Sequence, residues 1–135
     1  MDEQERHAAG MRVRREVLGD AHVDRAEALK SELDTEFQDL IARLAWGETW
    51  TRSGLPRHTR SLLTIGLMVA LNRDEELRLH MRAARNNGVT KDEIREVLLH
   101  CAVYCGIPAA NSAFLLAREV LKEEKRPELS ADGPV

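Results

Sequence analysis

The chain has two cysteines, and they are the first candidates for reactive side chains. Cys101 and Cys105 lie one helical turn apart in the stretch HCAVYCGIPAANSAF. Both fall on the same face as the aliphatic residues that precede them, where unpaired cysteine commonly packs. A redox dithiol is better served by C-x-x-C at a helix start, and zinc would need further ligands that His100, on another face, does not supply. We therefore expect two packing residues and no metal site.

A second group, in the stretch EELRLHMRAARNNG, has the composition of a proton-transfer site. Glu76 and His80 are one helical turn apart on one face, and Arg73 lies a turn before them. A carboxylate near an imidazole fixes its tautomer and favours the imidazolium, which can donate a proton near neutral pH. Exposed Glu–His pairs with no function have the same spacing, so the spacing alone leaves both interpretations open.

The spacing of apolar residues predicts helices through the first half of the chain. A first helix should end at Gly19, and residues 20–33 fit no clear pattern. Asp34 or Thr35 can cap a second helix, which we expect Gly47 to end. The stretch RVRRE within the first helix indicates a solvated face or a contact between subunits.

Helical patterns continue through the second half. Pro56 can begin a helix that is apolar in nearly every direction, so we expect that helix to be central and buried. Asn72 with Glu75, and Thr90 with Glu93, each have the spacing of a capping box that starts a helix.

Helix ends are predicted at Asn87–Gly88 and at Gly106, after which Pro108 can begin the last helix. No segment alternates with a period of two for the length of a strand, so the predicted fold class is all-α. We expect a single compact multi-helix domain over residues 1–125 and a flexible tail over residues 126–135.

Composition narrows the classes of function. The 135 residues suit one domain, and 20 Lys and Arg against 23 Asp and Glu give a net charge of only -3. Such a balance offers no basic field for a phosphate backbone, so we expect no nucleic-acid partner. The first residues are charged and no apolar run reaches the length of a membrane span, so we expect a cytoplasmic protein without a membrane partner.

Four stretches of the sequence resemble a known family: MRVRREVLGDAHVD, WGETWTRSGLPRHTRSLLTI, ELRLHMRAARNNGVTKDEI and HCAVYCGIPAANSAF. They are similar to the carboxymuconolactone decarboxylase family of the alkylhydroperoxidase D-like superfamily, over nearly the whole chain. The superfamily's peroxidases use C-x-x-C followed by a histidine. Placing His80 on that histidine puts Arg73 and Glu76 where the cysteines would be, and Ser61 where an upstream glutamate would be. The resemblance therefore implies no peroxidase thiols.

The resemblance implies decarboxylation of 4-carboxymuconolactone to 3-oxoadipate enol-lactone and CO2, in the protocatechuate branch of the beta-ketoadipate pathway. This substrate is a dicarboxylate lactone, and its own carbonyl can accept the electron pair left by CO2. No cofactor is then required. The protein would need to anchor the spectator carboxylate, stabilise the dienolate oxygen and deliver a proton.

The expected catalytic residues are His80, as proton donor or dienolate stabiliser, and Glu76, which would hold it. An arginine fork matches a carboxylate, and Arg60 leads because a helix start also offers free N–H groups. The other arginines considered for this role are Arg57, Arg73 and Arg85.

Aromatic and amide side chains form a second set of candidates for substrate binding. Trp50 could line a pocket, although Trp46 and Trp50 are more often expected to be core anchors in a chain with few aromatic residues. Tyr104 and Asn111 flank a helix break and could point donors toward one site, or satisfy the broken backbone.

The wide apolar faces predict a homo-oligomer, and the resemblance implies a hexamer built as a ring of three dimers. Two other functions remain open: a thiol-dependent peroxidase-type protein that uses Cys101 and Cys105, and a helical oligomer without catalysis.

Overall fold

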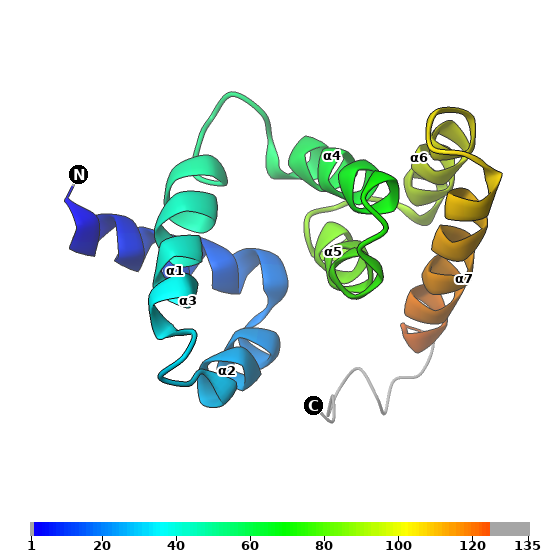
Figure 1. Cartoon of the computed structure of the whole chain (residues 1–135). Coiled ribbons are helices and arrows are strands. Elements are labelled where there is room, and N and C mark those ends of the chain that lie inside the picture. Colours follow the sequence, from blue (N-terminus) through cyan, green and yellow to red (C-terminus); the bar gives the residue numbers. More distant parts are fainter. Residues whose placement is uncertain (1, 125–135) are drawn as a thin grey trace. The chain divides into compact units, whose positions relative to one another are not determined.

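The computed structural model describes residues 2–124, and every regular element in that range is a helix. The predicted all-α class is therefore confirmed for these residues. Contacts divide the helices into two compact units, with the division between Arg57 and His58. The first unit is coloured from blue to cyan and the second from green to orange in Figure 1. The tail predicted at residues 126–135 lies outside the described residues.

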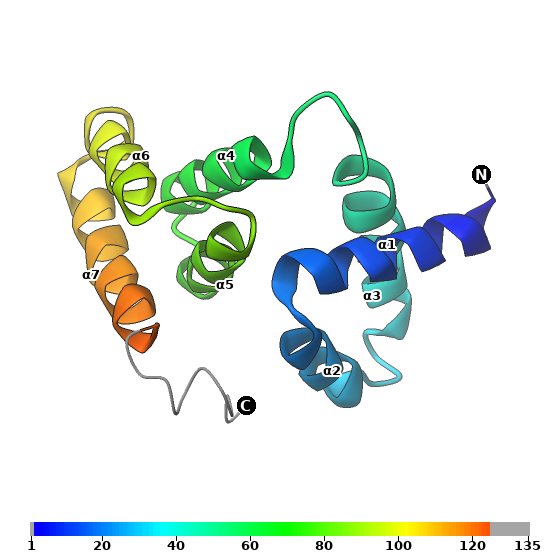
Figure 2. The same ribbon diagram turned by 180° about the vertical axis from the view of Figure 1, so that it is seen from behind.

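The first unit contains α1 (Glu3–Leu18), α2 (Asp20–Leu29), α3 (Thr35–Ile41) and the π-helix η1 (Ala42–Thr49). α1 ends at Gly19 as predicted, with φ at 94°. α2 occupies most of residues 20–33, a segment that fits no clear pattern in the sequence. α3 and η1 form one continuous helical segment, and α1 packs across it (Figure 2).

Two glycines permit the close crossing of α1 and η1. A Cβ added at Gly10 would lie 1.9 Å from the carbonyl oxygen of Ala42, and one at Gly47 would lie 2.4 Å from that of Arg6. Only glycine allows two backbones to approach so closely. The prediction that Gly47 ends its helix is wrong, because η1 continues to Thr49. This glycine serves the contact between helices and not a helix end.

Arg14 corrects the interpretation of RVRRE as a solvated face or a subunit contact. Its position on α1 falls on the same face as Gly10 and Val17, so its side chain is buried within the first unit. Arg14 Nη1 lies 3.6 Å from Glu27 Oε1. Burial lowers the pKa of Arg14, and the nearby carboxylate of Glu27 opposes that change. Arg12 is exposed, as expected of a solvated face.

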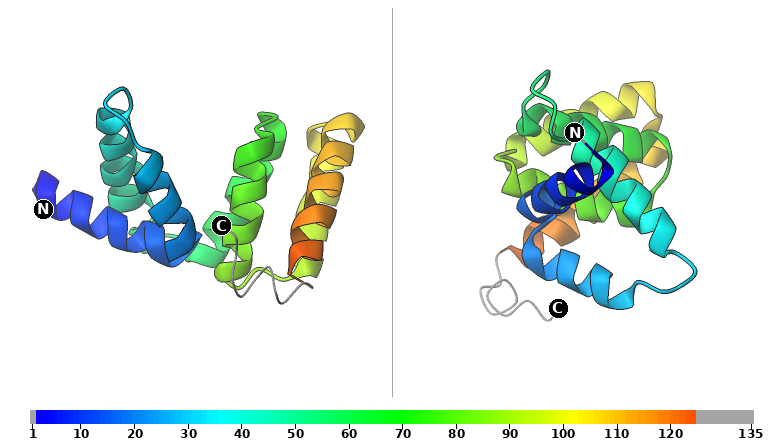
Figure 3. Two further views of the ribbon diagram at one scale, coloured as in Figure 1. Left: turned by 90° about the horizontal axis from the view of Figure 1, so that it is seen from below. Right: turned by 90° about the vertical axis from the view of Figure 1, so that its left-hand side faces the viewer.

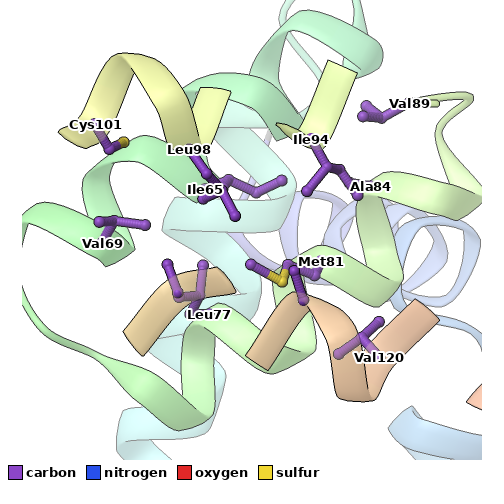
Figure 4. Close-up of a cluster of buried hydrophobic side chains, with 12 residues drawn as sticks. Ile65, Val69, Leu77, Met81, Ala84, Val89, Ile94, Leu98, Cys101 and Val120 are labelled. Carbon is purple, nitrogen blue, oxygen red and sulfur yellow. The ribbon is translucent and has the colours of Figure 1, made fainter. Parts of the chain in front are cut away.

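The second unit contains α4 (Arg57–Ala70), α5 (Asp74–Asn86), α6 (Lys91–Tyr104) and α7 (Ile107–Glu123), of which α4 begins at the division between the units. α7 runs back along α6, and α5 packs against α7 (Figure 3). All four helices contribute to one apolar core (Figure 4), which consists of Ile65, Val69, Leu77, Met81, Ala84, Val89, Ile94, Leu98, Cys101, Ala113, Ala117 and Val120.

α4 is less buried than its composition predicts. Ile65 and Val69 face the core, but Leu63 and Leu67 are 55% and 50% exposed, and Leu71, directly after the helix, is 57% exposed. The prediction of a helix buried on all sides is therefore wrong for the chain as described. The core of the second unit covers only one face of α4. Because α4 is apolar on nearly every face, leucines on its other face are left exposed.

Asn72 does not start a helix, so the capping box predicted there is wrong. This residue has φ at 58°, and its N–H donates to the carbonyl of Val69 at 3.2 Å. The N–H of Arg73 donates to the carbonyl of Met68 at 3.0 Å. These two bonds form a Schellman ending for α4, in which asparagine takes the left-handed position that glycine usually occupies.

The other predicted helix boundaries are confirmed. Gly88 and Gly106 have φ at 86° and 101° and follow the ends of α5 and α6. Thr90 and Glu93 form the predicted capping box at the start of α6. Pro108 lies in the first turn of α7.

The Glu93 carboxylate should make stability depend on pH in the acid range. The backbone N–H of Thr90, and then His58 at 2.9 Å, lower the pKa of Glu93 below its ordinary value. A carboxyl group with a depressed pKa stabilises the fold above its unfolded pKa, and that contribution is lost as the pH falls through the folded pKa. We expect Tm to fall less steeply for Glu93→Gln than for the wild type between about pH 5.5 and pH 3.

Thermal unfolding followed by circular dichroism would measure this effect. Glu96→Gln, an exposed carboxylate on the same helix that takes no part in the capping box, is the matched control. Parallel pH profiles for the wild type and Glu93→Gln would contradict the prediction.

Candidate active site

His80 lies at the edge between the buried and exposed faces of α5. Leu77 and Met81 are 2% and 0% exposed and point into the core, as Figure 4 shows. His80 directly precedes Met81 and is itself half-buried. The core therefore anchors the backbone that carries the imidazole, while part of the ring still reaches the surface.

The residues predicted beside His80 occupy the outer side of α5. Arg73 is the N-cap residue of α5 and Glu76 lies in its first turn, and both side chains are exposed. Spacings of three and four residues place Arg73, Glu76 and His80 along one stripe of the helix, spanning about 10 Å along its axis. We call these three residues the α5 stripe. It combines a guanidinium, a carboxylate and an imidazole on one rigid element.

Ion pairs fix the position of α5 along α7. The pairs join Arg78 to Glu119, Arg82 to Glu123 and Arg85 to Glu124. Arg82 donates to both carboxylate oxygens of Glu123, at 3.0 and 2.9 Å, and this two-point contact restricts the geometry of the pair. Together with the core, these pairs hold the α5 stripe in a defined orientation within the second unit.

The contacts of the four candidate arginines differ. Arg57 Nη2 lies 2.9 Å from Glu16 Oε1, and Arg85 donates to Glu124 and, at 2.7 Å, to the carbonyl oxygen of Val89. Both guanidiniums are thus engaged in structural contacts, which does not favour them as substrate anchors. Arg60 is half-buried in the first turn of α4.

Of the four candidate arginines, Arg73 alone is exposed and is therefore the most available to a ligand. Its guanidinium makes no hydrogen bond or ion pair with any residue between 2 and 124. It also shares the α5 stripe with Glu76 and His80. An exposed guanidinium about two helical turns from an imidazole can bind one carboxylate of a small molecule whose other end lies near His80.

The aromatic and amide candidates do not gather around the α5 stripe within the second unit. Trp50 belongs to the first unit, where its ring lies 5.3 Å from that of the buried Trp46. Tyr104 is 77% exposed at the end of α6, and its ring lies 4.8 Å from that of His100. Asn111 is exposed in the first turns of α7.

Ser61 and Asn87 form a buried polar contact that the sequence did not predict as a pair. Asn87 Nδ2 donates to Ser61 Oγ at 2.9 Å, and Ser61 is 1% exposed. Ser61 lies on the same face of α4 as the buried Ile65 and Val69. A buried hydroxyl requires a hydrogen-bond partner, so this position in the sequence could have indicated a polar contact. The contact ties the end of α5 to α4.

The cysteines lie where packing residues were expected. Cys101 is buried in the core and Cys105 is partly exposed, and both are free thiols. Burial, and then the neighbouring Cys105, raise the pKa of Cys101 to about 11. A thiol with so high a pKa is a poor nucleophile at neutral pH, which counts against a peroxidase that uses this residue.

Alkylation should therefore discriminate between the folded and unfolded states. At about pH 8 a thiol of pKa about 11 is thiolate in only about one part in 1,000, so iodoacetamide should modify Cys101 at least about 100-fold more slowly than a free cysteine. Mass spectrometry of timed samples would measure this rate, with the same protein in guanidinium chloride as control. Equally fast labelling of Cys101 in both states would revive the redox alternative.

Residues 2–124 contain neither a cluster suited to a metal ion nor a helix suited to a membrane. No group of three or more His, Cys, Asp or Glu side chains in this range is arranged to hold a metal ion. Among the same residues, no helix has both the length and the apolar composition needed to cross a membrane.

Comparison with known proteins defines the family. Residues 35–119 match the Carboxymuconolactone decarboxylase family, a match that includes all of the α5 stripe. The chain therefore belongs to this family, and the resemblance predicted from its sequence is confirmed.

Individual relatives agree with this assignment. The chain is 52% identical to 4-carboxymuconolactone decarboxylase from Acinetobacter baylyi, over 91% of this chain and 92% of the relative. It is 44% identical to a nitrosuccinic acid decarboxylase from Metarhizium robertsii, over 88% and 87% of the two chains. A match of 54% identity to a 4-carboxymuconolactone decarboxylase sequence from Pseudomonas putida covers 36% of this chain and all of the relative.

Proposed function

We propose that this protein is a carboxy-lyase that converts 4-carboxymuconolactone to 3-oxoadipate enol-lactone and CO2. The observation that carries the proposal is the 52% identity to the Acinetobacter enzyme over nearly the full length of both chains. The α5 stripe supports it, because a cation, a carboxylate and an imidazole are the groups that this reaction can use.

The chemistry explains why so few polar groups would suffice. Breaking the bond between the ring and its carboxylate releases CO2 and leaves an electron pair on the ring. That pair moves through the double bond to the lactone carbonyl and forms a dienolate, so the substrate is its own electron acceptor. A proton added to the carbon next to the carbonyl gives the enol-lactone.

In this mechanism His80 supplies the proton or a hydrogen bond to the dienolate oxygen, and Glu76 orients its imidazole. The carboxylate that remains on the acetate arm is bound by an arginine. Arg57 and Arg85 are held in structural ion pairs, and we favour Arg73 for this role because it is exposed and lies on the α5 stripe.

The wider setting of the enzyme is part of the proposal. We place the reaction in the protocatechuate branch of the beta-ketoadipate pathway and in the cytoplasm, which suits free thiols in a reducing compartment. We also propose a homo-oligomer, with a ring of three dimers as the expected form. The exposed leucines of α4 support an oligomer, since large exposed apolar patches mark interaction surfaces.

The direct test is CO2 release from freshly generated 4-carboxymuconolactone by the purified protein, in the presence of a chelator and without added thiol. Release well above the spontaneous rate supports the proposal. A folded protein that gives no acceleration would overturn it.

Nitrosuccinic acid should be tested in the same assay, because the relative from Metarhizium robertsii is named for it. The name of that relative specifies nitrosuccinic acid, a dicarboxylic acid in which the nitro group can accept an electron pair as the lactone carbonyl does. Assaying both compounds in parallel would assign the substrate. Greater kcat/KM on nitrosuccinate would replace the lactone as the proposed substrate while keeping the reaction type.

Loss of the Arg73 guanidinium should weaken substrate binding more than turnover. Hydrogen bonds to charged groups contribute about 1.5–3 kcal/mol, so Arg73→Gln should raise KM by about 10- to 100-fold. Arg73→Lys should recover part of the loss, because it keeps the charge but not the fork. Steady-state kinetics of these variants, with Arg95→Gln on α6 as control, would test the role. An unchanged KM would leave Arg60 as the remaining candidate.

A further inference from the structure

The first unit presents an apolar surface that none of its own helices covers. Phe37, Leu40 and Leu44 follow one another at spacings of three and four residues along α3 and η1, and all three are exposed. Ala42 and Trp46, on another face of the same segment, are buried. The segment therefore uses one face for its own core and presents a second apolar face outward. We call Phe37, Leu40 and Leu44 the outer α3 face.

A hollow and a separation of charge accompany this face. An open hollow of about 550 Å³ is lined by Glu36, Phe37, Asp39, Leu40 and Arg43. Glu36 lies in the first turn of α3, Asp39 lies near the middle of the segment and Arg43 lies in η1. The Glu36 carboxylate makes no hydrogen bond or ion pair with any residue in the described range 2–124. Arg43 Nε lies 3.0 Å from Glu3 Oε2, and Asp39 Oδ1 lies 3.2 Å from His7 Nε2.

We propose that the occupant of the outer α3 face is the same face of a second copy, packed antiparallel about a two-fold axis near Leu40. An antiparallel arrangement brings Glu36 of each copy toward Arg43 of the other, whereas a parallel arrangement would place like charges together. The surface is thus complementary to itself, which is the condition for a two-fold symmetric interface. The apolar side chains of one copy would fill the hollow of the other.

This inference rests on the homo-oligomer of the proposed function and gives it a specific interface. The decarboxylase activity and the interface can fail separately, because the interface is tested by a readout that does not involve turnover.

Single cysteines test the symmetry directly. Around a two-fold axis identical residues meet, and a disulfide requires Cα atoms about 4.4–6.8 Å apart. We expect one of Phe37→Cys, Leu40→Cys and Leu44→Cys, with Leu40→Cys the fastest, to form a dimer under mild oxidation. Peptide mapping should find the new cysteine joined to itself, which distinguishes this link from any that involves the native thiols.

Leu99→Cys on α6 is the matched control, because Leu99 and Leu40 are 48% and 45% exposed. The inference is overturned if no variant of the outer α3 face forms the self-linked peptide faster than Leu99→Cys. Circular dichroism of each variant establishes that the fold is retained, which exposed positions should permit.

Charge reversal provides a second test that needs no new cysteine. Glu36→Arg alone and Arg43→Glu alone place like charges opposite each other across the interface, so each should shift the sedimentation profile toward smaller species. The double variant restores the complementarity in reverse and should recover the larger species. A double variant that dissociates as much as the two single variants combined would overturn the antiparallel arrangement.

Discussion

Replacing His80 with alanine should lower kcat by about 100- to 10,000-fold, the usual contribution of a positioned general acid or base. The imidazole is half-buried at the margin of the second unit, and its neighbours Leu77 and Met81 carry the core contacts. The variant should therefore keep its helical content and its assembled mass. Initial rates of CO2 release, together with circular dichroism and sedimentation, would separate loss of chemistry from loss of fold.

His7→Gln is the control for His80→Ala, because His7 is a half-buried histidine of the first unit and glutamine can still bond to Asp39. It should retain wild-type turnover. An unchanged kcat/KM for His80→Ala would remove His80 from the mechanism.

Glu76→Gln refines the same assignment through the pH profile. If the carboxylate favours the protonated imidazole, the amide should move the alkaline limb of kcat toward lower pH and leave the fold intact. Identical profiles would mean that Glu76 is an ordinary exposed residue.

The largest effect on stability should come from Gly10→Ala. The added methyl would lie 1.9 Å from the carbonyl oxygen of Ala42, and that oxygen belongs to a backbone that cannot rotate away. Overpacking usually costs about 1–3 kcal/mol, and contact with backbone should place this variant at about 3 kcal/mol or more. Unfolding in denaturant would measure the loss.

Gly66→Ala is the matched comparison in α4. A Cβ added at Gly66 would meet no atom within 4 Å, so alanine should stabilise the helix by about 0.5–1 kcal/mol. Opposite signs for the two substitutions are the expected result. If Gly10→Ala were as stable as the wild type, the close crossing of α1 and η1 would not describe the protein in solution.

Local signals allowed much of the helical fold to be predicted. Gly19, Gly88 and Gly106 could be predicted as helix ends because few residue types adopt a positive φ readily. The Thr90–Glu93 capping box could be predicted because it forms within one helical turn. Asn72 was misassigned because asparagine suits both an N-cap and a left-handed C-terminal position. The choice between them depends on where α4 can pack.

Contacts distant in sequence could not be predicted. A glycine such as Gly47 is a local signal for a helix end. Its actual role, to allow close contact between backbones, depends on α1 crossing η1 at Gly10. The sequence offered Arg85 as a substrate anchor, whereas its pairing with Glu124 joins residues 39 positions apart and follows only from the packing of α5 on α7. The α5 stripe was predictable because helical spacing alone places its three residues together.

The two faces of α5 also bear on how members of this family could change their substrates. Core residues and candidate reactive residues alternate along a single helix, so the outer positions can vary without creating a cavity in the interior. One relative is named for a lactone and another for a nitro acid, and both are similar to this chain over most of their length. This separation of core residues from candidate reactive residues is compatible with such different substrates. If the α5 stripe binds the substrate as proposed, its exposed positions can be substituted while Leu77 and Met81 keep the core of the second unit packed.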